Sequence, residues 1–202
     1  MRYKAVIAYD GTDFYGWQSQ AGGNTIQDYL EERLAVVFKE AIRIHGSGRT
    51  DSGVHAKGQV AHFDAEWKHG IDKLQRALST SLPDGIQIVS LREVGPDFHA
   101  RFAATGKRYS YTWHEGQVNP FISRYVAETG HHRLDAEAMH RAAQALVGRH
   151  DFSAFAASRG DGTDEDPVKM LYRVDIKRAG KQVRLITEGS GYLYKMVRSM
   201  AG

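Results

Sequence analysis

The chain of 202 residues contains no cysteine. Disulfide bonds and thiolate metal sites are therefore excluded, and the composition fits a reducing compartment such as the cytoplasm. The chain also lacks an apolar run long enough to span a bilayer, and its first ten residues lack the apolar core of a signal peptide. From these absences we expect a cytoplasmic protein without a membrane partner.

Metal-binding patterns are missing as well. Ten histidines are present, but none stands in an H-E-x-x-H arrangement. His131 and His132 are adjacent in the sequence, so their side chains would point apart on either a helix or a strand. We therefore expect no metal site.

A strong excess of one charge is also missing. The 27 lysines and arginines stand against 24 acidic residues, which gives a net charge of +3 and only weak support for nucleic-acid binding. Residues 98–108, however, hold cations and aromatic rings and no acid. The cations are Arg101, Lys107 and Arg108. They are accompanied by His99, Phe98 and Phe102, and Tyr109 follows directly. Such a segment can bind RNA by charge and base stacking, but many solvated surfaces look the same.

Alternating strand and helix patterns divide the chain into two halves, residues 1–100 and 101–202. In the first half, residues 2–9 alternate as a strand does, and Thr25 followed by Asp28 predicts the start of a helix. Further strands are predicted at 41–45, 58–64 and 86–92, with a second helix at 71–81. This order of elements is the split βαβ pattern.

The second half begins in the same way. Tyr109, Tyr111 and Trp113 share one face of a predicted strand, and Asp135 caps a helix that Gly148 would terminate. Strands at 172–177 and 183–187 form a hairpin, a last helix opens near Tyr192, and residues 156–168 form a mobile loop. The predicted fold class is α+β, with two ferredoxin-like (RRM-like) halves and mostly antiparallel sheets.

Residues 46–62, G-S-G-R-T-D-S-G-V-H-A-K-G-Q-V-A-H, carry the strongest functional signal. They place Asp51 between Arg49 and His55 in a segment with four glycines, and glycine permits positive φ or close approach to a ligand. An acid held in such a turn beside cations is a candidate nucleophile. A phosphate-binding loop would need lysine and then serine or threonine after the glycines. A hairpin turn with a solvated aspartate is the alternative.

The motif G-R-T-D-x-G-V-H-A resembles the signature of the tRNA pseudouridine synthase A family, whose members isomerise uridines in the tRNA anticodon arm. Other family motifs follow in order along nearly the whole chain: Tyr9-Asp10-Gly11-Thr12, Gly16-Trp17-Gln18, Phe98-His99-Ala100-Arg101-Phe102, Lys107-Arg108-Tyr109 and Met196-Val197-Arg198. The resemblance implies sheets joined around a central catalytic cleft, targets at tRNA positions 38–40, and a homodimer that holds one anticodon arm.

The implied reaction breaks the N-glycosidic bond of uridine, rotates the base and joins C5 to C1′. Because no redox change occurs and no group is lost, no cofactor is expected. A carboxylate can attack C1′, promote a glycal by taking a sugar proton, or attack C6, and the sequence leaves these routes open. The uridine must also be turned out of the RNA, which costs a few kcal/mol.

The resemblance also implies roles for individual residues. Asp51 and Arg198 are the catalytic pair, in which the guanidinium offsets the desolvation of the carboxylate. Tyr109 stacks on the target base, and Arg49 fills the gap that the flipped uridine leaves. The remaining predicted contacts are Leu193 and Met196 in the pocket wall, and Arg101, Lys107, Arg108 and Lys195 on the RNA backbone.

Without the resemblance, each pattern has a simpler interpretation. Arg198 can be an exposed helix arginine, Tyr109 a core aromatic residue, and Arg49 a structural partner of Asp51 or Asp64. Two rival functions are a non-catalytic RRM-like RNA-binding protein and a carboxylate hydrolase, for which two close carboxylates would be expected. Because family members continue beyond Gly202, we expect the second half to be truncated in its last helix.

Overall fold

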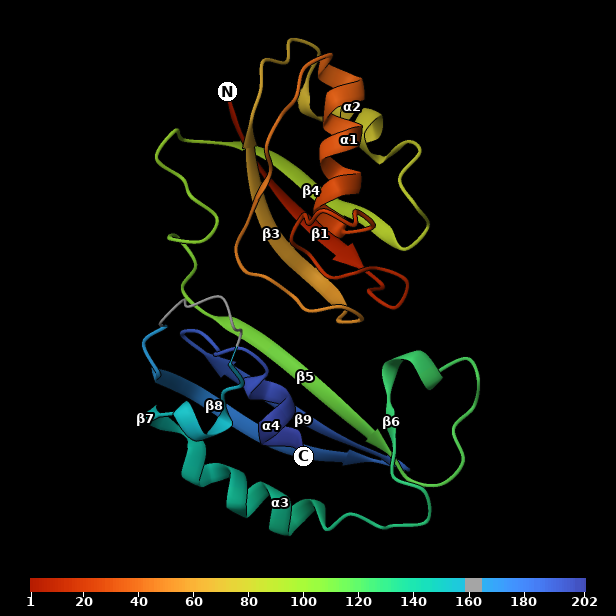
Figure 1. Cartoon of the computed structure of the whole chain (residues 1–202), viewed down its shortest axis with the longest axis vertical. Helices are drawn as coiled ribbons and strands as arrows, with labels where there is room; N and C mark the ends of the chain where they lie inside the picture. The colour runs from red at the N-terminus through yellow and green to blue at the C-terminus, as the bar shows by residue number, and fades with distance from the viewer. Residues whose placement is uncertain (159–164) are drawn as a thin grey trace. The chain divides into compact units, whose positions relative to one another are not determined.

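The structure is a computed structural model that describes residues 1–158 and 165–202 (Figure 1). Its internal contacts divide the chain into two compact units, Met1–Ala104 and Thr105–Gly202, and each unit is described by itself. The loop predicted at 156–168 lies in part outside the described residues, because these omit 159–164. No helix within the described ranges has the length and apolar content to cross a membrane.

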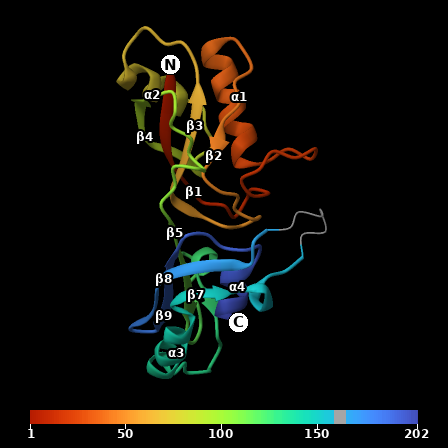
Figure 2. The ribbon, with the colours of Figure 1, turned by 90° about the vertical axis from the view of Figure 1, so that its left-hand side faces the viewer.

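The first unit is a four-stranded sheet with two helices. Its elements are β1 (Arg2–Tyr9), α1 (Ile26–Phe38), β2 (His45–Gly46), β3 (Ala56–Asp64), α2 (Ile71–Ser79) and β4 (Ile86–Val94). The strand order is β2-β3-β1-β4, and each neighbouring pair is antiparallel. Figure 2 shows the short β2 beside β3. This is the predicted split βαβ pattern.

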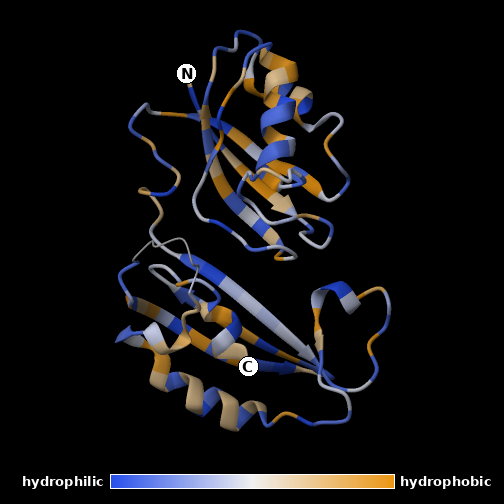
Figure 3. Cartoon of the chain, viewed as in Figure 1, coloured by the Kyte–Doolittle hydropathy of each residue, from blue (hydrophilic) through white to orange (hydrophobic). Residues whose placement is uncertain are grey.

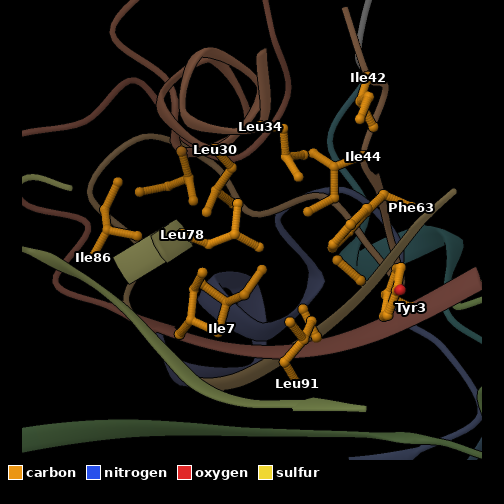
Figure 4. Close-up of a cluster of buried hydrophobic side chains, with 14 of the residues drawn as sticks. Tyr3, Ile7, Leu30, Leu34, Ile42, Ile44, Phe63, Leu78, Ile86 and Leu91 are labelled. Carbon is orange, nitrogen blue, oxygen red and sulfur yellow. The ribbon is translucent and has the colours of Figure 1, made fainter. Parts of the chain in front are cut away.

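The hydrophobic core of this unit lies on one face of the sheet. Leu30 and Leu34 of α1 and Leu78 of α2 belong to the same buried cluster as Ile7 and Phe63 (Figure 4). Full burial of one such side chain contributes roughly 1.5–3 kcal/mol. Because both helices share one core with the odd-numbered residues of β1, they cover the same face and leave the opposite face of the sheet without a helix.

The start of α1 is the one that the sequence predicts. The Asp28 backbone N–H donates to the Thr25 hydroxyl oxygen at 3.2 Å, and the Thr25 backbone N–H donates to an Asp28 carboxylate oxygen at the same distance. This reciprocal pair satisfies two N–H groups at the helix start. Figure 3 shows both hydrophobic and hydrophilic residues along α1, and its buried residues Ile26, Leu30 and Leu34 recur every four positions, so they lie on one face of the helix.

The prediction of a strand at 41–45 is wrong in extent, because β2 covers only His45 and Gly46. The backbone of Ile44 is engaged by side chains of α1 instead. Its N–H donates to Glu31 Oε1 at 3.1 Å, and its carbonyl accepts from Gln27 Nε2 at 3.2 Å. With both groups taken, Ile44 cannot pair with β3.

The second unit repeats the arrangement with additions. Its elements are β5 (Lys107–His114), β6 (Ala127–Glu128), α3 (Ala136–Ala143), β7 (Gly148–Asp151), β8 (Val168–Ala179), β9 (Gln182–Gly189) and α4 (Met196–Ala201), with short 3-10 turns at Ser123–Tyr125, Gln144–Leu146 and Ser153–Phe155. The strand order is β6-β5-β9-β8-β7, in which only the β5–β6 pair is parallel. The series β5-α3-β8-β9-α4 follows the split pattern, and the α+β class is confirmed.

Two boundaries in this unit differ from the prediction. Gly148 does not terminate α3, which ends at Ala143 and continues as a 3-10 turn; it opens β7 instead, with φ of 116°. The last helix opens at Met196 rather than near Tyr192. Lys195 directly before it has a left-handed φ of 59°, which an α-helix cannot contain.

Candidate active site

Asp51 lies in the loop between β2 and β3 of the first unit and is half-buried. The Val54 N–H donates to the Asp51 carbonyl at 3.1 Å, which closes a tight turn directly after the acid. Gly53 within this turn has φ of 76°, a conformation that favours glycine. The turn thus fixes the backbone from which the carboxylate projects.

A second segment, residues 9–17, holds the loop on both sides of Asp51. Before the acid, the Trp17 N–H donates to the Thr50 carbonyl at 3.0 Å, and the hydroxyl groups of Tyr9 and Thr50 lie 2.8 Å apart. After the acid, the Ser52 hydroxyl donates to the Phe14 carbonyl at 3.2 Å. These bonds leave the Asp51 backbone little freedom.

Two glycines make this close contact possible. A Cβ atom at Gly11 would lie 2.1 Å from the Val54 carbonyl oxygen, and one at Gly16 would lie 2.5 Å from the Thr50 carbonyl oxygen. Gly16 also has φ of 88°. Neither position can therefore hold a larger residue without displacing the loop. Both glycines stand within the family motifs, but this role has no local signature because it depends on segments far apart in the chain.

His55, at the end of the loop, joins it to the end of β1. His55 Nδ1 lies 3.1 Å from the Gly11 backbone nitrogen and 3.0 Å from an Asp10 carboxylate oxygen. It accepts from the Gly11 N–H when unprotonated and donates to Asp10 when protonated. Asp10 in turn accepts from the hydroxyl and the N–H of Thr12. His55 therefore belongs to the support of the loop.

Arg49 is exposed two residues before Asp51. One suggested partner, Asp64, is engaged elsewhere: Arg2 Nε and Nη2 donate to its two carboxylate oxygens at 2.8 and 2.7 Å. These bonds from Arg2 hold the pKa of Asp64 below its usual value. The pairing of Arg49 with Asp64 is thus not observed, and its guanidinium lies where RNA could reach it.

Tyr109 lies in β5 of the second unit and is half-buried. Its ring meets the Tyr192 ring edge-on, with centroids 5.0 Å apart, and the Tyr192 hydroxyl lies 2.9 Å from the Thr187 hydroxyl. Burial raises the pKa of Tyr192 well above its usual value, so Tyr192 remains protonated. Tyr109 thus packs against a half-buried ring whose hydroxyl is hydrogen-bonded.

Arg198 is an exposed residue of α4, and this helix contacts β5, the strand that carries Tyr109. Leu193 and Met196, predicted to line the substrate pocket, are 7% and 0% exposed and belong to the hydrophobic core of the second unit. Their burial fixes the start of α4. The exposed Lys195 lies between them, with its Nζ 5.3 Å from the centroid of the Tyr194 ring.

The other predicted RNA-backbone contacts differ in their surroundings. Arg101 is exposed, and Lys107 is half-buried at the start of β5. Arg108 Nη2 lies 2.8 Å from Glu188 Oε1, and the arginine side chain is 69% exposed. Glu188 Oε1 is buried and also lies 3.5 Å from Arg173 Nη1, so the exposed Arg108 can turn to a phosphate while Arg173 stays beside the carboxylate.

Metal ligands do not converge in the part of the chain that the structure describes, where no group of three histidine, aspartate or glutamate side chains is placed to hold an ion. His45, His62 and His99 come close together; the His45 and His62 rings stack, and the His99 ring is tilted by 59° against His62.

Comparison with known proteins identifies the family. The sequence model of the tRNA pseudouridine synthase family matches residues 5–103 and 142–202, a range that includes Asp51 and Arg198. The chain belongs to this family. It is 43% identical to tRNA pseudouridine synthase A of Lysinibacillus sphaericus over 203 residues, which is 100% of this chain and 82% of that protein.

Two further relatives carry the same or nearly the same name. The tRNA pseudouridine synthase A 1 of Protochlamydia amoebophila is 41% identical over 99% of this chain and 79% of its own length. The Listeria monocytogenes tRNA pseudouridine synthase A is 41% identical over 100% of this chain and 81% of its own length. Membership in the family makes the chain an enzyme, a pseudouridine synthase.

Proposed function

We propose that the chain isomerises uridine to pseudouridine in the anticodon stem-loop of tRNA, at positions 38–40, with Asp51 as its catalytic carboxylate. The observation that carries this proposal is the construction of the Asp51 loop, which segment 9–17 holds on both sides of the acid. Family membership supplies the reaction, and the loop supplies a rigidly placed carboxylate. The targeted positions rest on the resemblance of the motifs.

The reaction needs a carboxylate whose position does not drift. The bond between N1 and C1′ of the flipped uridine breaks, and C5 forms the new bond to C1′. The proton on C5 is then released, and N1 gains one. Asp51 assists by attacking C1′ or C6, or by taking a sugar proton to give a glycal. In each route, fixing the carboxylate against the nucleotide lowers the entropic part of the barrier.

Arg198 and Tyr109 complete the proposed site. A base that covers Asp51 removes water from the carboxylate and so destabilises its negative charge, and a guanidinium beside the acid opposes that effect. We assign this task to Arg198, which is exposed on α4. Tyr109 stacks on the target base and offers its hydroxyl for the late proton transfer from C5. Leu193 and Met196 then act by holding α4.

RNA binding rests on cations of both units. Arg49 occupies the space that the flipped uridine leaves, and phosphates are bound by Arg101, Lys107, Arg108 and Lys195. The catalytic cleft would join the halves 1–100 and 101–202, in a cytoplasmic homodimer that holds one anticodon arm and needs no cofactor. Light scattering tests the dimer, and a monomer that is fully active would contradict it.

The deciding experiment uses transcript tRNA that carries tritium at C5 of uridine. The parent protein should release tritium, and Asp51→Ala should release none while it still binds the RNA. Replacing the uridines at positions 38, 39 and 40 by cytidine, one at a time, should remove the corresponding share of the signal. Free uracil among the products would instead indicate a hydrolase, and binding without release by the parent protein would indicate an RNA-binding module.

A further inference from the structure

A row of four aromatic rings crosses the first unit, away from the Asp51 loop. His45 of β2 stacks on His62 of β3, with centroids 5.1 Å apart and planes inclined by 26°. The His62 ring lies 4.6 Å from the His99 ring, with the two planes tilted by 59°, and His99 stacks on Phe102 at 4.3 Å and 28°. His62 is 3% exposed, whereas His45 at one end of the row is exposed and Phe102 at the other end is 78% exposed, so a buried ring lies between two exposed ends.

The outer end of the row is anchored. Phe102 belongs to segment 96–104, which lies on the sheet face that no helix of this unit covers. Arg2, an even-numbered residue of β1, projects from that face and donates to the Phe98 carbonyl at 2.9 Å. The Ala100 N–H donates to His62 Nδ1 at 3.2 Å, and Ala100 is itself buried. The backbone of the segment that carries the exposed Phe102 ring is therefore held in place by hydrogen bonds to the sheet.

The centre of the row carries no charge near neutral pH. Burial lowers the pKa of His62 to about 4, and the neighbouring rings of His99 and His45 add to this effect. Nδ1 of His62 accepts a hydrogen bond, so its other ring nitrogen holds the proton. His62 in the middle of the row is thus neutral, and the last ring, Phe102, offers a face to solvent.

The surroundings of Phe102 suit a nucleotide. Arg101, next to it in the chain, is exposed, and Lys4 Nζ lies 5.3 Å from the centroid of the nearby Phe98 ring. No acidic residue occurs between positions 98 and 108. Proteins that bind unpaired RNA combine these features, because an aromatic ring stacks on the base while a cation meets the phosphate.

We propose that Phe102 is a stacking site for an unpaired nucleobase of the tRNA substrate, other than the uridine that is isomerised. The occupant is an unpaired base because a base within a helix has both faces covered by its neighbours. It would extend the row by one ring, with Arg101 beside its phosphate. The proposal rests on the proposed function for the identity of the RNA, but its test measures binding separately from chemistry.

The test compares two RNAs of equal length and charge, an anticodon stem-loop and a blunt duplex. Because stacking on one base contributes about 1–3 kcal/mol, Phe102→Leu should weaken stem-loop binding about tenfold and leave duplex binding unchanged. Phe102→Trp should restore stem-loop binding, and its added fluorescence should be quenched by the stem-loop only. Phe121→Leu, which alters an 89% exposed ring of the second unit, is the matched control and should bind as the parent does.

Equal binding of the stem-loop by Phe102→Leu and the parent would overturn the proposal, as would equal losses for stem-loop and duplex. A change in oligomeric state would mean that the ring contacts protein instead. If Phe102→Leu is destabilised, the fluorescence of Phe102→Trp decides, and a lack of quenching by the stem-loop refutes the site. The parent protein could bind the stem-loop through Phe102 and yet release no tritium. That result would refute the proposed reaction but support the stacking site.

Discussion

The two segments assigned to catalysis are fixed by opposite means. The Asp51 loop is held by backbone contacts that require the absence of side-chain atoms at Gly11 and Gly16. The start of α4, which carries Arg198, is held by side chains, because Met196 is completely buried in the core of the second unit. The first segment should therefore be sensitive to added atoms and the second to removed atoms.

The largest effect is expected from removing atoms at α4. Met196→Ala leaves a cavity in a close-packed core, and such changes cost about 2–5 kcal/mol. Urea unfolding followed by α4 and β5 amide signals should show this loss in the second unit. Met170→Ala, at a position that is 37% exposed, is the control and should stay within about 0.5 kcal/mol of the parent. Equal losses in the two variants would show that α4 is not held by burial.

Adding one carbon atom beside the Asp51 loop should lower the catalytic rate. In Gly11→Ala, the new Cβ would lie 2.1 Å from the Val54 carbonyl oxygen, so the loop must shift. A displacement of about 1 Å can cost about a hundredfold in rate. Single-turnover tritium release at saturating RNA measures this effect.

The control for this variant is Gly22→Ala, because a Cβ at Gly22 meets nothing within 4 Å. We expect it to keep the parent rate within twofold. If Gly11→Ala were as active as Gly22→Ala, the close contact would not position Asp51, and the contrast between the two segments would disappear.

Sequence alone predicted the parts of the fold that depend on local pattern. β1 and α1 follow from alternation and from the Thr25–Asp28 capping box, whose partners are three residues apart. The strand at 41–45 failed because side chains of α1 occupy the backbone of Ile44, a tertiary contact that no local pattern encodes.

The same limit applies to the site. The glycine-rich motif pointed to Asp51, but the roles of Gly11 and Gly16 appear only when segment 9–17 is placed against the loop. The row of rings likewise depends on the register that sets His45 opposite His62. Family resemblance predicted the reaction class, which composition and spacing could not supply.

The units should also differ in their response to acid. The pKa of His62 is lowered from 6.5 to about 4, so the folded first unit binds fewer protons than the unfolded chain between these values. Its stability should be fully present above pH 6.5 and fall as the pH drops toward 4, on the order of 2 kcal/mol by pH 5. The groups that face this ring are His45, His99, Arg2 and Asp64.

Hydrogen exchange of β3 amides at pH 7 and pH 5 measures this effect. His62→Asn, which can still accept the Ala100 N–H, should reduce the dependence on pH, whereas the β9 amides should respond alike in both proteins. An unchanged slope in His62→Asn would assign the acid sensitivity to other groups.

The smallest effect is expected from a single hydrogen bond beside the loop. Tyr9→Phe removes the hydroxyl that lies 2.8 Å from the Thr50 hydroxyl. A bond of this kind contributes about 0.5–1.5 kcal/mol, so the rate should fall by about two- to tenfold. Tyr15→Phe, at a position that is 57% exposed, serves as the control. Equal rates in the two variants would show that the bond between Tyr9 and Thr50 does not help to position the Asp51 loop.

The central claim is that the negative charge on Asp51 carries the reaction. Asp51→Asn preserves the size of the side chain and removes only its charge, and its single-turnover tritium release should be measured at saturating RNA. We predict a rate no higher than that of RNA without protein, with the dissociation constant for the stem-loop within a few fold of the parent value. Release at the parent rate would contradict the account.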